Sequence, residues 1–146
     1  MKKLLLIFVA LFLVMNLFGQ VRNFEEIPKD ILKHFDKMGI NDSLVLNKYE
    51  SAYFNVRFKD SLNGFDFTNK KIVFFRTGIK KSNKKDYFDM QKKHSANENY
   101  PCDNGTLYIF DPASKKKSGG YDAAIVYWNK VFVPIEKIVE RLKEQP

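Results

Sequence analysis

Residues 123–128 read Ala-Ala-Ile-Val-Tyr-Trp, an apolar run without a charged residue. Two similar runs precede it: Ile-Val-Phe-Phe at 72–75 and Leu-Tyr-Ile-Phe at 107–110. All three are rich in β-branched and aromatic residues and are bounded by turn-forming residues, which is typical of β-strands. Because none of them alternates with polar residues, we expect strands that are covered on both faces, as in α/β sheets. These strands would form the interior layer of one domain.

The segments between these runs indicate how the strands pair. A helix is predicted over 82–94, with Ser82 or Asn83 as its N-cap. This connection is long enough for a crossover, so the strands at 72–75 and 107–110 can be parallel. Residues 111–120 have a single apolar side chain and predict an exposed turn, whose flanking strands can be antiparallel. A small mixed sheet of three to four strands results.

Helical patterns flank these strands, which makes the expected fold α/β or α+β. One helix should begin at Pro28 and end at Gly39. A second is favoured over 48–58, after an Asn47–Glu50 capping box, although 54–58 also alternates as a strand would. The predicted apolar faces are Phe24, Ile27, Ile31, Phe35 and Met38 in the first helix and Ile135, Ile138, Val139 and Leu142 in a last helix that Pro134 opens.

The N-terminus has the composition of a secretory signal peptide over residues 1–19. Lys2 and Lys3 give it a positive start, residues 4–15 are apolar, and Gly19 is a small residue suited to the cleavage position. The apolar core is short for a bilayer span, although an uncleaved anchor is the alternative. We therefore expect a secreted or periplasmic protein, with one globular domain over 20–146 and no transmembrane span in the mature chain.

The chain is basic, with 25 Lys and Arg residues against 17 Asp and Glu residues and a net charge of +8. The charge falls to +6 once Lys2 and Lys3 are removed with the signal. Such a charge either keeps the protein soluble or attracts it to an anionic surface. Arg, the residue favoured for bidentate phosphate recognition, is scarce. With export, this scarcity argues against nucleic acid and leaves an anionic surface or another exported protein as the expected partner.

Lysines occur in runs at 80–81, 84–85, 92–93 and 115–117, and three of these runs flank or occupy the predicted helix at 82–94. Tyr87 and Phe88 within it either add contact area for a sugar or lipid surface or turn inward beneath a solvated lysine face. The Gly119-Gly120 pair lets the backbone approach a ligand closely, beside Tyr121. The candidate ligand-binding residues are Lys84, Lys85, Lys92, Lys93 and Tyr121.

No strong catalytic or metal-binding motif is present, and we expect neither a metal nor a cofactor. The sequence therefore favours a non-catalytic binding module. The alternative is a small hydrolase or thiol enzyme, since His94 is eight residues from the lone Cys102 and could activate its thiol. Asp103, Asp111 and Asp122 could also gather at one end of the sheet as an acid/base pair or cation site, although Asp residues commonly just shape turns. Cys102, His94 and Asp122 are thus the candidate catalytic residues.

Overall fold

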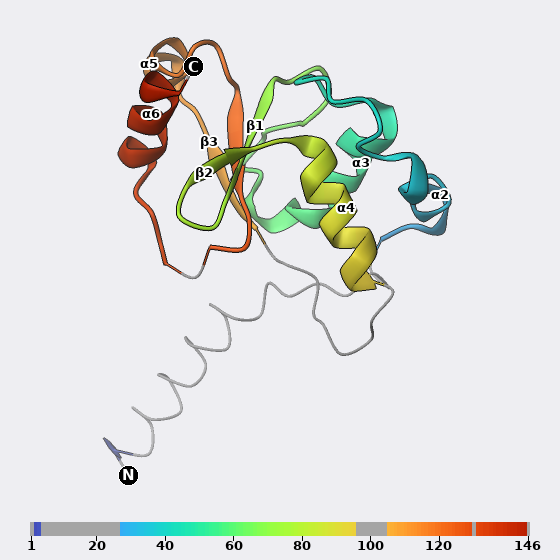
Figure 1. The fold of residues 1–146 in the computed structure, drawn as a ribbon. Helices are drawn as coiled ribbons and strands as arrows, with labels where there is room; N and C mark the ends of the chain where they lie inside the picture. The colour runs from blue at the N-terminus through green and yellow to red at the C-terminus, as the bar shows by residue number, and fades with distance from the viewer. Residues whose placement is uncertain (1, 4–26, 96–104, 130, 146) are drawn as a thin grey trace.

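A four-stranded mixed sheet is the centre of the computed structural model (Figure 1). The structure describes residues 2–3, 27–95, 105–129 and 131–145. The strands are β1 (Ile72–Arg76), β2 (Lys80–Ser82), β3 (Thr106–Ile109) and β4 (Ala123–Val126), in the order β2-β1-β4-β3. The three apolar runs therefore form strands as predicted. The fourth strand, β2, was not predicted, because its residues were expected to flank the helix over 82–94.

The pairing of the strands corrects one expectation. β1 and β4 are parallel, with Ile72 opposite Ala123, whereas β3 is antiparallel to β4, as expected for a short connection. The prediction that β1 and β3 can be parallel is wrong, because β4 lies between them and β3 runs against both. The central position goes to β4, whose four side chains are all buried, and the partly exposed β3 lies at an edge.

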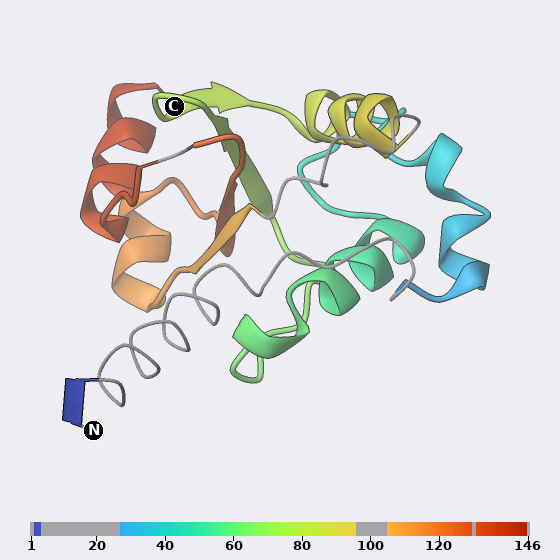
Figure 2. The ribbon, with the colours of Figure 1, turned by 90° about the horizontal axis from the view of Figure 1, so that it is seen from below.

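Helices cover both faces of the sheet (Figure 2). Ile72 and Phe74 of β1 pack into one apolar cluster and Val73 and Phe75 into another. The helices on the first face are α2 (Lys29–Leu32), α3 (Lys48–Arg57) and α4 (Lys84–Ser95), and those on the second are α5 (Pro112–Lys117) and α6 (Ile135–Glu144). Coverage on both faces is thus confirmed for β1 and β4, and it is incomplete for β3, where Leu107 and Ile109 are only half-buried.

The helix expected over 28–39 is interrupted. α2 ends at Leu32, and a turn leads into a 3₁₀ helix, η2, at Phe35–Lys37. Successive i→i−3 hydrogen bonds, such as His34 N–H to the Ile31 carbonyl at 3.1 Å, tighten this segment. Its predicted apolar residues Ile27, Ile31, Phe35 and Met38 are nevertheless buried. Phe24 and the expected signal peptide, apart from Lys2 and Lys3, lie outside the described residues.

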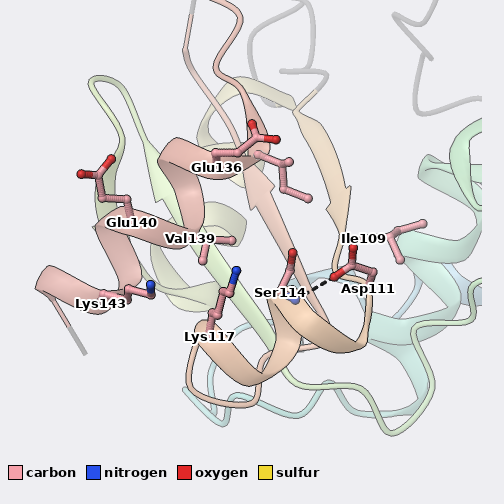
Figure 3. A pocket seen from close by; sticks show the side chains of 9 residues that line it. Ile109, Asp111, Ser114, Lys117, Glu136, Val139, Glu140 and Lys143 are labelled. Carbon is pink, nitrogen blue, oxygen red and sulfur yellow. Dashed lines mark hydrogen bonds between the residues drawn. The ribbon is translucent and has the colours of Figure 1, made fainter.

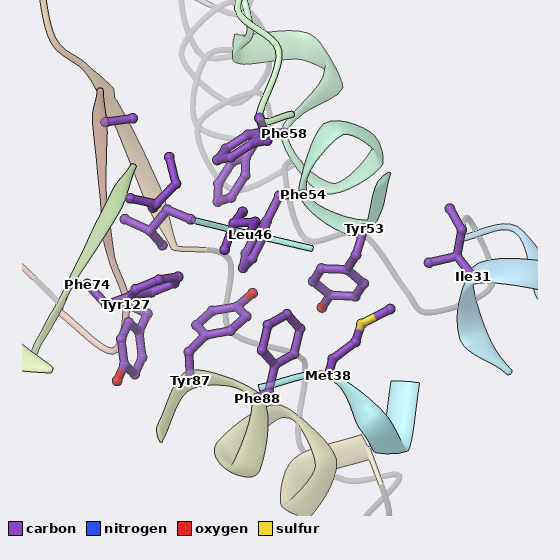
Figure 4. Close-up of a cluster of buried hydrophobic side chains, with 14 of the residues drawn as sticks. Ile31, Met38, Leu46, Tyr53, Phe54, Phe58, Phe74, Tyr87, Phe88 and Tyr127 are labelled. Carbon is purple, nitrogen blue, oxygen red and sulfur yellow. The ribbon is translucent and has the colours of Figure 1, made fainter. Parts of the chain in front are cut away.

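Aromatic side chains fill the space between the sheet and α2, α3 and α4 (Figure 4). Phe54 of α3 is fully buried at the centre of this cluster. Its ring centroid lies 5.2 to 6.2 Å from those of Tyr53, Phe58, Phe67, Phe74, Tyr87 and Phe88. Tilted and edge-on aromatic pairs at such distances stabilise a core beyond the area they bury.

A buried ion pair joins α3 to α4 beside this cluster. The Lys84 ammonium lies 3.0 Å from Oε2 of Glu50, and the two side chains are 3% and 0% exposed. The same carboxylate accepts the backbone N–H groups of Asn47 and Gly39, each at 2.9 Å. Asn47 in turn accepts the Glu50 N–H, which confirms the predicted capping box. Glu50 thus has three donors, which offset its desolvation.

Lys84→Met should lower the free energy of unfolding by about 3–5 kcal/mol, because it leaves the Glu50 carboxylate buried and unpaired. The Glu50→Gln, Lys84→Met double variant should lose less than the two single variants together, as measured in a urea-unfolding double-mutant cycle. Lys85→Met is the control: Lys85 is exposed beside Asp89, and its loss should cost less than about 1 kcal/mol. Equal losses for the two lysines would contradict the role given to the pair.

Candidate functional site

The parallel pair β1 and β4 ends at one edge of the sheet, and polar side chains gather there. Arg76 is the last residue of β1 and Tyr127 directly follows β4. β2 returns along β1 with Lys80 opposite Arg76, and α4 begins two residues after β2 ends. In open sheets, the carboxyl edge of parallel strands is the usual place for a ligand.

Four side chains form a hydrogen-bonded network at this edge. The Tyr127 hydroxyl donates to Oδ2 of Asp86 at 2.5 Å, and Ser82 Oγ donates to the same oxygen at 3.2 Å. The Ser82 and Tyr127 hydroxyls also share a hydrogen bond. The other Asp86 oxygen, Oδ1, lies 3.5 Å from the Arg76 guanidinium. The Asp86 carboxylate thereby connects Tyr127, which lies 41 residues later in the chain, to Arg76 and Ser82.

The contacts of this network stabilise the edge of the sheet, and its hydroxyl groups are not activated for a reaction. The pKa of the Tyr127 hydroxyl is raised, mainly because the side chain is buried and further because it donates a hydrogen bond to the Asp86 carboxylate. The phenol therefore stays protonated at neutral pH and acts as a donor, not as a base or nucleophile. Ser82 has no histidine or lysine among its hydrogen-bond partners in the described residues that could activate it.

A cleft with a volume of about 480 Å³ opens beside this network. Its walls are Arg76, Thr77, Lys80, Lys81, Ser82, Asn83 and Asp86. They carry three cations and one carboxylate, and that carboxylate already has two hydroxyl donors. We call this the basic cleft. Its positive charge and its hydroxyl and amide groups suit a small anionic group or the edge of a larger anionic surface.

The turn that borders the basic cleft has a strained backbone. Between β1 and β2, Gly78 has φ +74° and Ile79 has φ +53°. Trp128, after β4, has φ +55°. Positive φ is costly for a β-branched or bulky residue and persists only where neighbouring contacts hold it. Here the Thr77 hydroxyl donates to the Trp128 carbonyl, which connects the two strained segments directly.

A protein-family model matches residues 42–144, described as a domain of unknown function, DUF8192. The chain belongs to this family. The matched span contains all four strands and every residue that lines the basic cleft, but not α2 or η2. No curated protein and no solved structure matches the chain.

A second cleft, of about 460 Å³, lies between α5 and α6 (Figure 3). Its apolar wall consists of Ile109, Ile135 and Val139, and charged residues of both signs surround it. The charged residues are Asp111, Lys117, Glu136, Glu140 and Lys143. With three carboxylates and two ammonium groups, this cleft does not share the positive character of the basic cleft, so the two differ in the ligands they could take.

The lysines suggested as ligand-binding residues have different surroundings. Lys84 is buried with Glu50, so its ammonium does not reach the surface. Lys92 donates to the backbone carbonyls of Asp36 and Met38, at 3.0 and 2.8 Å, and thereby holds the end of η2. Lys85 pairs with Asp89, and Lys93 is exposed.

The aromatic residues of the same prediction face inward. Of the two arrangements left open for Tyr87 and Phe88, the structure has the inward one, since both are fully buried. They therefore add no contact area for a ligand. Tyr121 is 8% exposed, and the Lys71 ammonium lies 5.4 Å from the centre of its ring.

The candidate catalytic residues are only partly within the described chain. Cys102 and Asp103 lie outside the described residues, and so does the side chain of His94, whose backbone forms part of α4. The thiol-enzyme hypothesis therefore stays a prediction. Among the described residues, no group of three or more His, Cys, Asp or Glu side chains could hold a metal ion. No described helix has the length and apolar composition to cross a bilayer.

Asp111 and Asp122 do lie at the same end of the sheet, where the Phe110 N–H donates to the Asp122 carbonyl. Each carboxylate has a structural partner there. Asp111 accepts the Ser114 N–H at 2.7 Å as the N-cap of α5, which lowers its pKa. Asp122 accepts the Lys71 N–H at 2.8 Å and pairs with the Lys115 ammonium at 2.7 Å.

The basic cleft shows what sequence reasoning missed. The lysine run at 80–81 is visible in the sequence, but Arg76 and Tyr127 carry no local signal of a site. One available signal is the spacing of Arg76 and Lys80 around Thr77-Gly78-Ile79. A three-residue connection containing glycine after an apolar strand indicates a hairpin, which would place these two cations opposite each other.

Tyr127→Phe should lower the free energy of unfolding by about 2 kcal/mol, because the Asp86 carboxylate loses a buried hydroxyl donor. Urea unfolding at neutral pH measures the loss. Tyr49→Phe is the matched control: Tyr49 is 40% exposed, and its change should stay within about 0.5 kcal/mol. If both variants were as stable as the parent, the network would not support this edge of the sheet.

Asp122→Asn should lower the free energy of unfolding at neutral pH by about 1.5 kcal/mol. Burial alone would raise the pKa of Asp122, but hydrogen bonds from Lys115 and from the Lys71 backbone outweigh it and lower the pKa below 3.8. The stabilisation is therefore complete above about pH 4 and is lost as the pH falls through the lowered pKa. Urea titrations across the acid range should show variant and parent converging, whereas exposed Asp42→Asn should change the free energy of unfolding at neutral pH by less than about 0.5 kcal/mol.

Proposed function

We propose that this protein is a non-catalytic binding module that is exported from the cytoplasm and recognises an anionic partner through the basic cleft. The observation that carries the proposal is the composition of the cleft. Arg76, Lys80 and Lys81 line one opening of about 480 Å³, against a single carboxylate that other side chains already engage.

The charge balance of the basic cleft supports binding to an anion. Arg76 shares its charge with Asp86 at 3.5 Å, which leaves Lys80 and Lys81 as the main source of positive potential. Lys80 is exposed, and the Lys81 ammonium lies 3.5 Å from the carbonyl of Gln145 near the chain end. Lysine is a flexible, hydrated point charge, so these residues suit a polyanion or a charged surface better than a fixed bidentate contact.

The surroundings of the cleft support binding rather than catalysis. Tyr127 and Ser82 direct their hydroxyls at Asp86, so the polar groups nearest the cleft are used to fix its shape. Export rests on the positive start, the short apolar core and Gly19 in the expected signal peptide. Outside the cytoplasm, the abundant anionic partners are lipid headgroups and acidic polysaccharides.

The test compares two double variants of equal charge. Lys80→Gln, Lys81→Gln removes the cleft lysines, and Lys33→Gln, Lys116→Gln removes two exposed lysines on α5 and at the end of α2. Affinity for labelled dextran sulfate at low salt should fall roughly tenfold in the cleft variant, because two cations beside the bound anion are lost.

The control variant should retain most of the parent affinity, and thermal unfolding should confirm that both variants fold. Equal affinity losses in the two variants would show that net charge alone governs binding and would overturn the proposal.

A further inference from the structure

Two adjacent apolar side chains are strongly exposed on the loop between β4 and α6. Val131 is 72% exposed and Phe132 is 80% exposed, which makes them the most exposed large apolar residues of the described chain. Single exposed apolar residues are common on soluble proteins, but an aromatic and an aliphatic side chain side by side at such exposure suggest a contact surface.

Hydrogen bonds engage the backbone carbonyls of Val131 and Val133. The Asn129 side-chain amide donates to the Val131 carbonyl at 2.8 Å. The buried Tyr108 hydroxyl donates to the Val133 carbonyl at 2.6 Å, and Val133 itself is 6% exposed. These two contacts position Val131 and Val133, and Phe132 between them is exposed. We call residues 131–132 the apolar tip.

The apolar tip is also connected to the hairpin that carries the cleft cations. The Gly78 N–H donates to Oδ1 of Asn129 at 3.4 Å, and the Thr77 hydroxyl donates to the Trp128 carbonyl. Arg76 and Lys80 flank this turn directly. Figure 1 shows the hairpin turn and the loop after β4 at the same end of the sheet. Apolar and positive groups therefore share one end of the molecule.

We propose that this end docks on an anionic lipid bilayer, with Val131 and Phe132 entering the headgroup–acyl boundary and Arg76 and Lys80 meeting the headgroup charges. The proposal deepens the proposed function and rests on it for the role of the cations. Apolar side chains at the interface combined with cations beside it are the recognised basis of reversible membrane binding.

The size of the apolar tip favours a bilayer over a protein partner. A stable protein–protein interface buries roughly 800 Å² on each partner around an apolar centre. Two side chains on a short loop offer much less. A bilayer needs no complementary shape, and a few inserted side chains suffice when electrostatic attraction adds to their effect.

The experiment measures binding to vesicles of phosphatidylcholine alone and of phosphatidylcholine with phosphatidylglycerol. All variants carry the same N-terminus, so differences between them report on the docking end. We expect the parent to prefer the anionic vesicles. Phe132→Ser should weaken that binding by about tenfold, whereas Ile40→Ser, at a 69% exposed position on a different loop, should leave it unchanged. Lys80→Gln should weaken it about fivefold, because one cation beside the headgroups is lost.

The outcomes separate this proposal from the one it rests on. If Phe132→Ser and Ile40→Ser bind anionic vesicles as the parent does, the apolar tip does not dock and the bilayer proposal fails, while binding to dextran sulfate can still uphold the basic cleft. If the parent binds dextran sulfate but not vesicles, the bilayer proposal also fails. A concentration-dependent dimer that Phe132→Ser abolishes in light scattering, without vesicle binding, would assign the tip to a second copy of the chain instead.

Discussion

The Glu50–Lys84 ion pair is the constraint on which much of this structure depends. It lies between α3 and α4, at the border of the aromatic cluster around Phe54. Burying two charges is costly, and the pair is stable here because the same carboxylate also accepts the backbone N–H groups of Asn47 and Gly39. The pair therefore fixes the start of α3, the loop after η2 and the first turn of α4 together. An added Cβ at Gly39 would come within 2.9 Å of the Phe88 side chain, which leaves this loop little freedom to move away.

The basic cleft follows from that constraint. Asp86 lies two residues beyond Lys84 in the first turn of α4. Its backbone N–H donates to the Asn83 side-chain oxygen at 2.7 Å. Once this turn is fixed, the Asp86 carboxylate reaches Tyr127 after β4 and Arg76 at the end of β1. The parallel pairing of β1 and β4 brings those two strand ends to one edge. The position of the cleft thus depends on both a helix contact and a strand order.

Local patterns predicted much of this fold, and they failed where a distant residue decides the outcome. The capping box at Asn47 and Glu50 and the buried face of α6 both depend on neighbours within one or two helical turns, so the sequence predicts them. The central position of β4 depends on which strand pairs with β1, and that pairing joins segments far apart in the sequence. Lys84 resembles its neighbour Lys85 in sequence, yet it is buried because Glu50 lies 34 residues earlier in the chain. Arg76 and Tyr127 become neighbours of one carboxylate only through the sheet.

The lysines of β2 also protect the edge of the sheet. β2 is an edge strand of the described sheet, and charged side chains on an edge discourage pairing with another chain. Edge protection explains Lys80 and Lys81, but it requires neither an opening between them and α4 nor an exposed Phe132. The hydrogen bonds that connect the hairpin turn to Trp128 and Asn129 stabilise backbone angles that a simple protective edge would not need. The two roles are compatible, since charges that repel a second strand remain free to attract an anionic surface. In the proposed docking, the exposed Val131 and Phe132 would therefore add apolar contacts to charges that already protect the edge strand.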